Sequence, residues 1–184
     1  MPWTSLGAVA LLRGINVGGH ARVPMADLRA VATDLGMADP RTHLQSGNLV
    51  FTAPPDELTG VGDRLEAAIA AAFGVDIRVL IRTHDDLTAA VARNPFAEAA
   101  AAEPKSVHLL FLDRAPTTDE VAGLDPDRSP PDEFSVSGRE IFLHYPNGSG
   151  RSKLTLDWFE RRLGASGTAR NWRTVTALID LTAT

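Results

Sequence analysis

Cysteine is absent from this chain of 184 residues, and its absence removes several kinds of site together. Disulfides, cysteine-bound zinc, iron–sulfur clusters and thiol nucleophiles are all excluded. The five histidines share no metal-ligand spacing, so we expect neither a metal nor a cofactor.

Long apolar runs are missing as well. No run approaches the ~18 residues that a membrane span requires, and residues 1–10 lack the basic flank and apolar region of a signal peptide. We therefore expect a soluble, cytoplasmic protein with no membrane partner.

Basic side chains are few over most of the chain. The net charge is −5, which argues against a general nucleic-acid coat protein. Residues 1–143 carry 12 Lys and Arg against 20 Asp and Glu, whereas residues 144–184 carry 6 against 3. The basic last fifth of the chain fits either a local anion site or a solvated helix face.

Hydrophobic periodicity and turn residues predict one order of elements twice. In the first half, strand, helix, two strands, helix and strand are expected at residues 6–16, 24–36, 41–45, 49–52, 56–73 and 76–82, with a trailing helix at 85–93. The same order recurs about 100 residues later, at residues 106–113, 117–124, 133–136, 140–145, 153–163 and 168–170, with a trailing helix at 172–181.

The repeated order indicates an α+β fold: a duplication of two ferredoxin-like βαββαβ subdomains with mainly antiparallel sheets. We expect the subdomains at residues 1–96 and 106–184, joined in one structural unit. The alanine-rich stretch between them, residues 97–105, is interpreted as a linker of low complexity.

Four segments carry more glycine, asparagine and basic residues than packing alone needs. They read RGINVGGH at residues 13–20, QSGN at 45–48, YPNGSGRSKLT at 145–155 and TARNW at 168–172. Together with their flanks, LRGINVGG and TARNWRTV, they are similar to segments of the bacterial family called domain of unknown function 1697, and the likeness spans residues 6–181. The resemblance implies a two-subdomain α+β fold more than a function, and it brings no catalytic residue.

The chemistry of these segments points to an anion. Glycines let the backbone approach a ligand, a helix N-terminus favours negative charge, and Arg, Lys and Asn supply donors. The spacing matches neither the dinucleotide fingerprint nor the P-loop. The candidate ligand-binding residues are Arg13, Asn16, Gly18, Gly19, Asn48, Asn147, Gly150, Arg151, Lys153, Arg170 and Asn171.

Each segment also has a purely structural interpretation. Residues 13–20 can be a connection that needs positive φ, residues 46–48 a hairpin turn, and residues 147–153 a strand-to-helix turn with Ser152 as N-cap. Trp172 can stack on a base or anchor the last helix in the core, and we expect the core role, with Val175, Leu178 and Ile179 on the same helical face.

Topology brings the four segments into two patches. In the expected fold, residues 13–20 lie beside 46–48 at one end of the first sheet, and 147–153 beside 170–172 at one end of the second. We expect the patches to frame a cleft between the subdomains that binds a phosphate-bearing small molecule, a nucleotide or a nucleic-acid end. The alternative is a protein-interaction or regulatory module in which the segments are structural glue. Without a clear nucleophile–base pair, the sequence predicts no reaction and leaves open whether the protein is an enzyme.

Overall fold

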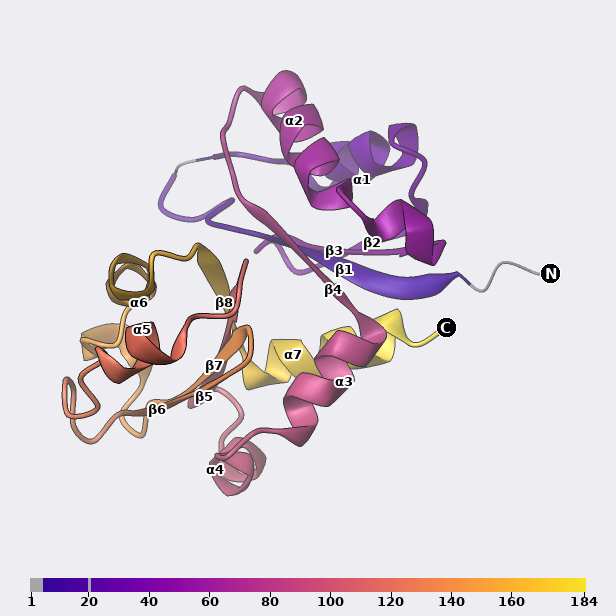
Figure 1. Ribbon diagram of the computed structural model, residues 1–184. Helices are drawn as coiled ribbons and strands as arrows, with labels where there is room; N and C mark the ends of the chain where they lie inside the picture. Colours follow the sequence, from indigo (N-terminus) through magenta and orange to yellow (C-terminus); the bar gives the residue numbers. More distant parts are fainter. Residues whose placement is uncertain (1–4, 20) are drawn as a thin grey trace. The chain divides into compact units, whose positions relative to one another are not determined.

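Strands of the computed structural model, which describes residues 5–19 and 21–184, form two four-stranded sheets over these residues (Figure 1). The strand orders are β2-β3-β1-β4 and β6-β7-β5-β8, and all neighbouring strands are antiparallel. Both orders are the same when each half is numbered from its own first strand. The expected α+β fold, with two similar ferredoxin-like halves, is therefore confirmed.

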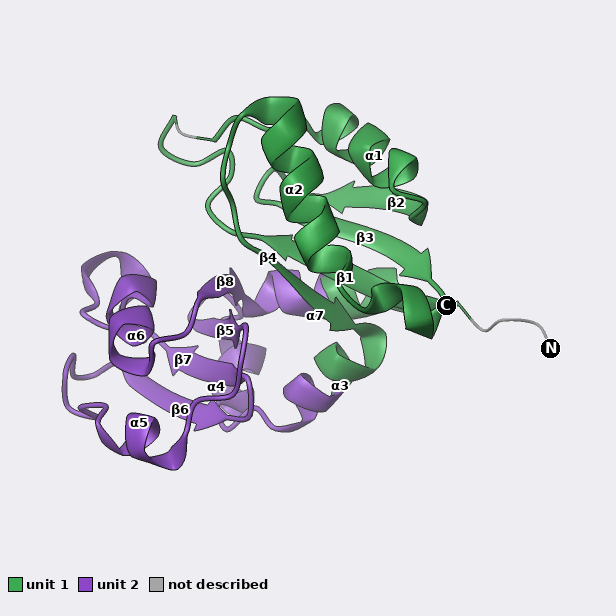
Figure 2. Cartoon of the chain, turned by 45° about the horizontal axis from the view of Figure 1, so that its top comes forward, with its two compact units in different colours: residues 1–88, 178–184 green, residues 89–177 purple. Residues whose placement is uncertain are grey.

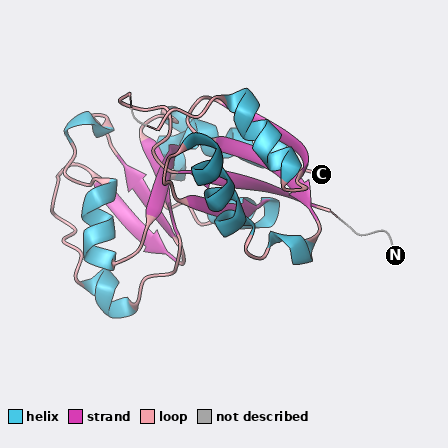
Figure 3. Ribbon diagram, turned by 90° about the horizontal axis from the view of Figure 1, so that it is seen from above, coloured by secondary structure: helices cyan, strands magenta, loops and turns pink. Residues whose placement is uncertain are grey.

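The expected strands and helices follow one another in the expected order, with one further helix at residues 97–102. The first half contains β1 (Leu6–Leu12), α1 (Met25–Asp34), β2 (Ala38–His43), β3 (Asn48–Ala53), the short 3-10 turn η1 (Pro55–Leu58), α2 (Val61–Phe73), β4 (Val79–Thr83), α3 (His84–Ala92) and α4 (Ala97–Ala102). The second contains β5 (Val107–Leu112), α5 (Thr118–Ala122), β6 (Glu133–Ser137), β7 (Glu140–His144), η2 (Ser149–Arg151), α6 (Leu156–Leu163), β8 (Gly167–Asn171) and α7 (Trp172–Thr182). In each unit the helices form layers beside the strands (Figure 3).

By its contacts the chain divides into two compact units (Figure 2). The first unit is Met1–Thr88 with Leu178–Thr184, and the second is Ala89–Ala177. The divisions fall inside α3 and inside α7, so they differ from the expected boundaries at residues 96 and 106. The expected subdomain boundaries stay a prediction.

The core of the first unit lies between its sheet and the pair α1 and α2, which cover the same face (Figure 1). Alternate residues of β1 point into this core because side chains alternate across a strand. Leu28 and Ala32 of α1 and Leu65 and Ile69 of α2 face them, each pair four residues apart and fully buried.

The far end of α7 completes the first unit. The Arg41 guanidinium donates to the Leu181 carbonyl at 3.1 Å, and His84 Nδ1 lies 3.2 Å from Thr182 Oγ1. Gly7 of β1 has no room for a side chain, because a Cβ atom there would overlap the Thr182 carbonyl. The last residues of the chain are thus packed against its first strand.

The second unit has its own core, on the face of its sheet that α6 covers. Trp158, Phe159 and Leu163 of α6 are buried against Leu110 of β5 and Ile141 of β7. The Trp158 and Phe159 rings meet edge to face, with centroids 4.8 Å apart.

Several element boundaries differ from the sequence prediction, and three of the differences concern the candidate segments or the expected linker. β1 ends at Leu12 instead of residue 16, because Gly14 and Asn16 both take left-handed φ values that end a strand. Residues 97–102, expected within a linker, form helix α4 inside the second unit, in keeping with the high helix propensity of alanine. Helix α6 starts at Leu156 instead of Lys153, and its N-cap is Thr155, whose side chain accepts from the Trp158 N–H.

Candidate functional site

The loop after β1 is tied to the β2–β3 turn through Asn16. Its Nδ2 donates to the Gln45 carbonyl at 3.0 Å and to the Val23 carbonyl at 2.9 Å, and its Oδ1 accepts from the Val23 N–H at 2.9 Å. The expected meeting of these two segments is therefore present. Both donors and the acceptor of the amide are spent on main-chain groups, which is what a structural role requires.

Asn48 is used in the same way. Its side chain is fully buried, and Nδ2 donates to the His43 carbonyl at 2.9 Å and to Ser46 Oγ at 3.3 Å. The neighbouring Gly47 has φ +82°, and a Cβ atom there would lie 2.8 Å from the Leu12 Cβ and 2.9 Å from the Ile15 Cγ1. Only glycine meets both demands, so this turn is locked into the end of the sheet.

The rest of the first patch consists of exposed glycines and Arg13. Gly18 and Gly19 are exposed and have positive φ. The Arg13 N–H donates to the Arg78 carbonyl at 2.9 Å, which joins the loop to the start of β4. His20, which belongs to the same expected segment, lies outside the described residues.

The loop after β7 is different, because it forms one wall of a groove of about 620 Å3. Asn147, Gly150 and Arg151 line this groove, and the segment 129–132 lines it as well. All three residues are exposed. Within the described part of the chain, the side chains of Asn147 and Arg151 make no hydrogen bond or ion pair. Their donors are therefore available to a ligand.

Hydrogen bonds of the Ser129 and Arg128 side chains connect the segments that line the groove. Ser129 Oγ accepts from the Lys153 N–H at 3.0 Å and donates to Asp132 Oδ2 at 2.9 Å, and Arg128 Nε donates to the Lys153 carbonyl at 3.0 Å. The Arg128 guanidinium lies 4.8 Å above the ring of Trp158 in α6. The groove thus has two walls that are connected to each other and to the core.

Charges of opposite sign face this groove. Arg151 is the cation among its lining residues, and Asp132 is the carboxylate. The Lys153 side chain is exposed but does not line the groove. An anion would gain from Arg151 and lose from Asp132, so the donors of Asn147 and the loop carry more of the selection than net charge does.

The remaining candidates, Arg170 and Asn171, do not line this groove. Arg170 is buried, and its NH1 donates to Thr168 Oγ1 at 2.7 Å and to the Ala169 carbonyl at 2.8 Å. Burial lowers the pKa of Arg170 to about 10, so it stays charged at neutral pH. Asn171 Oδ1 accepts from the Thr174 N–H at 3.0 Å, which is the bond of a helix N-cap, here for α7.

Trp172 has the core role that the helical pattern predicts. Its side chain is 8% exposed, and Val175 and Leu178 on the same face are fully buried. Ile179 is only partly buried.

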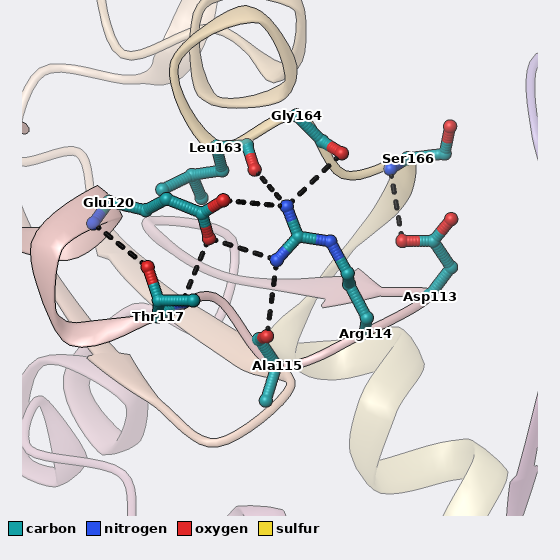
Figure 4. Close-up of polar contacts among 8 residues, drawn as sticks. All are labelled: Asp113, Arg114, Ala115, Thr117, Glu120, Leu163, Gly164 and Ser166. Carbon is teal, nitrogen blue, oxygen red and sulfur yellow. Dashed lines mark hydrogen bonds and ion pairs between the residues drawn. The ribbon is translucent and has the colours of Figure 1, made fainter.

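Sequence reasoning missed a charged network at the end of β5, shown in Figure 4. Arg114 pairs with both carboxylate oxygens of Glu120, at 2.9 and 2.8 Å, and donates to the Leu163 carbonyl at the end of α6. The hydrogen bond from Arg114 lowers the pKa of Glu120 to about 2, and the Thr117 N–H adds to this effect. A Thr-x-x-Glu spacing, which is typical of a capping box, was the available signal.

Two absences concern the described residues only. Within 5–19 and 21–184, no three His, Asp or Glu side chains gather into a group that could hold a metal ion. In the same part of the chain, no helix has the length and apolar character needed to cross a membrane. The cytoplasmic location stays a prediction.

Comparison with known proteins places these observations in a family. The model of a family described as a protein of unknown function, DUF1697, matches residues 7–142. The chain therefore belongs to this family, as the sequence segments predicted. The matched range includes the first two of those segments and ends before the other two.

A solved structure supports the same fold. A conserved bacterial protein from Streptococcus pneumoniae is 23% identical, with a TM-score of 0.73, over 97% of this chain and 99% of that chain. At this identity the likeness concerns the fold. No curated protein matches the chain.

Proposed function

We propose that the second unit binds a phosphate-bearing or similar anionic ligand, such as a nucleotide or a nucleic-acid end, in the groove beside Arg151. The observation that carries the proposal is the state of the donors. Asn147 and Arg151 line a groove of about 620 Å3 and have no partner within the described residues. A volume of this order is typical of small-molecule sites.

The local backbone supports an anion as the ligand. Gly148 and Gly150 carry no side chain beside the groove, and a Cβ atom at either position would meet no atom of the described residues within 4 Å. Main-chain groups can thus come close to a ligand oxygen. Arg151 supplies a planar guanidinium that binds phosphate in a bidentate manner.

The contribution of the first patch is structural in this proposal. Asn16 and Asn48 spend their amides on the main chain. These bonds favour the alternative function, an interaction or regulatory module with the segments as structural glue, for the first unit. The cleft expected between the subdomains, with both patches on one ligand, stays a prediction.

The test is a thermal-shift screen of nucleotides, sugar phosphates and inorganic phosphate. A ligand at 100 times its Kd stabilises a protein by about 2.7 kcal/mol. Arg151→Ala should leave the melting temperature of the free protein nearly unchanged, since an exposed charge contributes under about 1 kcal/mol. It should weaken the bound anion several-fold, with the difference shrinking at high salt.

Matched variants locate the effect. Arg162→Ala removes an exposed arginine on α6 that does not line the groove, and it should leave the affinity unchanged. Lys153→Ala should have a smaller effect than Arg151→Ala, because Lys153 stands outside the groove lining. If no anion in the screen stabilises the protein and Arg151→Ala lowers the melting temperature, the loop at residues 147–153 has a structural role and is not a binding site.

A further inference from the structure

The second unit contains another hollow, of about 430 Å3, which shares no residue with the groove beside Arg151. Its walls come from the end of α3, from α4 and from the first turns of α7. Every lining residue lies between Val91 and Thr176, inside the second unit.

Most of the wall is apolar, and the hollow is open on the α4 side because the side chains there are small. Ala97, Ala100 and Ala101 of α4 contribute only methyl groups, and a larger side chain at these positions would fill the space. Trp172 faces them from α7. Since it is 8% exposed, most of its indole is fixed by packing, and the remainder belongs to a rigid aromatic wall.

Three polar residues complete the hollow, Asn94, Arg173 and Thr176, and the Thr176 hydroxyl donates to the Trp172 carbonyl at 3.2 Å. The Asn94 amide is oriented by the Phe96 N–H, which donates to its Oδ1 at 2.9 Å, and its buried Nδ2 has no hydrogen-bond partner among residues 5–19 and 21–184. A buried donor without an acceptor is costly, so this atom favours the arrival of an oxygen. The Arg173 side chain is exposed and makes no hydrogen bond or ion pair within the described residues.

We propose that this hollow binds a small ligand that combines a planar ring with a single anionic group. The ring covers Trp172 and the methyl groups of α4, where apolar contact is favourable. The anionic group lies at Arg173, and a small turn of the Asn94 amide lets Nδ2 donate to one of its oxygens. An aromatic carboxylate and a nucleoside monophosphate share this chemistry.

Heteronuclear NMR of the full chain tests the proposal at the atom concerned. The indole N–H signal of Trp172 is assigned by its loss in Trp172→Phe, and it is followed during titration with naphthoate and with adenosine monophosphate. At least one of the two should shift it saturably, and their relative affinities separate the two sources of the ligand. Naphthalene carboxamide, which keeps the ring and lacks the charge, should bind about tenfold more weakly.

Variants divide the ring from the charge. Ala101→Leu fills the hollow and should abolish the shift, and Ala97→Leu does so independently if the first variant fails to fold. Arg173→Gln should weaken the charged ligand about tenfold, whereas Arg162→Gln, on α6, should change nothing. Arg151→Ala should also leave this binding intact, which separates the hollow from the groove proposed above.

The proposal is overturned by any of three results. These are no saturable shift with either charged probe, equal affinity for the carboxamide, or equal binding by the folded Ala101→Leu variant.

Discussion

Asparagine side chains have different roles in the two units. In the first, Asn16 and Asn48 use their amides to fasten one loop to another, and main-chain atoms are their main partners. In the second, Asn147 leaves its amide open to a groove. The difference lies in burial: Asn48 is fully buried, so an unpaired amide there would be costly, whereas the exposed Asn147 can be solvated by water.

The units also differ in whether charged or neutral groups hold their loops in place. The first unit joins the β1–α1 loop to the β2–β3 turn with neutral amide bonds. The second holds the segment after β5 with the Arg114–Glu120 ion pair. Neutral bonds of this kind do not depend on pH, whereas the ion pair requires an ionised carboxylate.

The largest expected effect belongs to the locked turn of the first unit. Gly47→Ala places a side chain in a left-handed position and against Leu12 and Ile15. Left-handed strain costs about 1–2 kcal/mol and overpacking about 1–3 kcal/mol, so a loss of about 3 kcal/mol is expected in chemical denaturation. Gly14→Ala is the control, because Gly14 also has positive φ but a Cβ there meets none of the described residues within 4 Å; it should lose about 1 kcal/mol. Equal losses would show that the turn is not locked by contact.

The two asparagines provide the next contrast. Asn48→Ala removes a fully buried amide and leaves the His43 carbonyl without this donor, which should cost about 2 kcal/mol. Asn147→Ala removes an exposed side chain and should change stability by less than about 0.5 kcal/mol. Urea denaturation of both variants measures the difference. If Asn147→Ala proves as destabilising as Asn48→Ala, the open groove is a structural element instead.

The acid range separates the neutral loop joint from the charged one. The pKa of Glu120 is about 2 in the folded protein, below the ordinary value of 4.5. The ion pair therefore stabilises fully above pH 4.5, and this contribution is lost as the pH falls from there toward 2. Glu120→Gln should accordingly lower the melting temperature at neutral pH and match the wild type near pH 2. If the melting temperatures of the two proteins differ by the same amount at every pH, the role assigned to the Glu120 carboxylate is contradicted.

The smallest effect concerns the carboxylate inside the groove. Asp132→Asn keeps an oxygen that accepts from Ser129 and removes the negative charge that faces Arg151. Stability should stay nearly constant, and the affinity for an anionic ligand should rise a few-fold, since removing a like charge favours the anion. Calorimetric titration of the anion found in the screen measures it. If this variant binds the anion more weakly than the wild type, Asp132 contributes more by ordering the loop than it costs by repelling the ligand.

The sequence contained enough to predict the strand order but not the state of the loops. Strands such as β1 and β5 are apolar runs ended by charge, and helices such as α2 repeat apolar residues at a spacing that fixes one buried face. Long periodic segments report their burial directly. This explains why the two halves could be predicted from periodicity, whereas the family resemblance rests on the four glycine- and asparagine-rich segments.

Loop chemistry is not readable in that way. Asn16 and Asn147 sit in similar glycine-rich contexts, and only the positions of Val23 and Gln45 in space decide that the first amide is saturated. Arg170 looked like a ligand donor, yet its place in β8 buries it. The hollow beside Trp172 was not predicted, because it exists only where α4 and α7 approach each other.

The discontinuity of the first unit bears on the order in which the chain can assemble. Its sheet and two covering helices are complete in sequence by Thr88, but Leu178–Thr184 also belong to it. As the chain leaves the ribosome, β1 emerges first and must wait for the whole of the second unit before Thr182 arrives beside Gly7. A contact between residues so far apart in the sequence slows folding. Until it forms, the part of β1 that Thr182 covers stays exposed. The last turn of α7 thus joins the first unit only after the second unit has been synthesised, and a chain stopped at residue 177 would leave β1 without the neighbour that Thr182 provides.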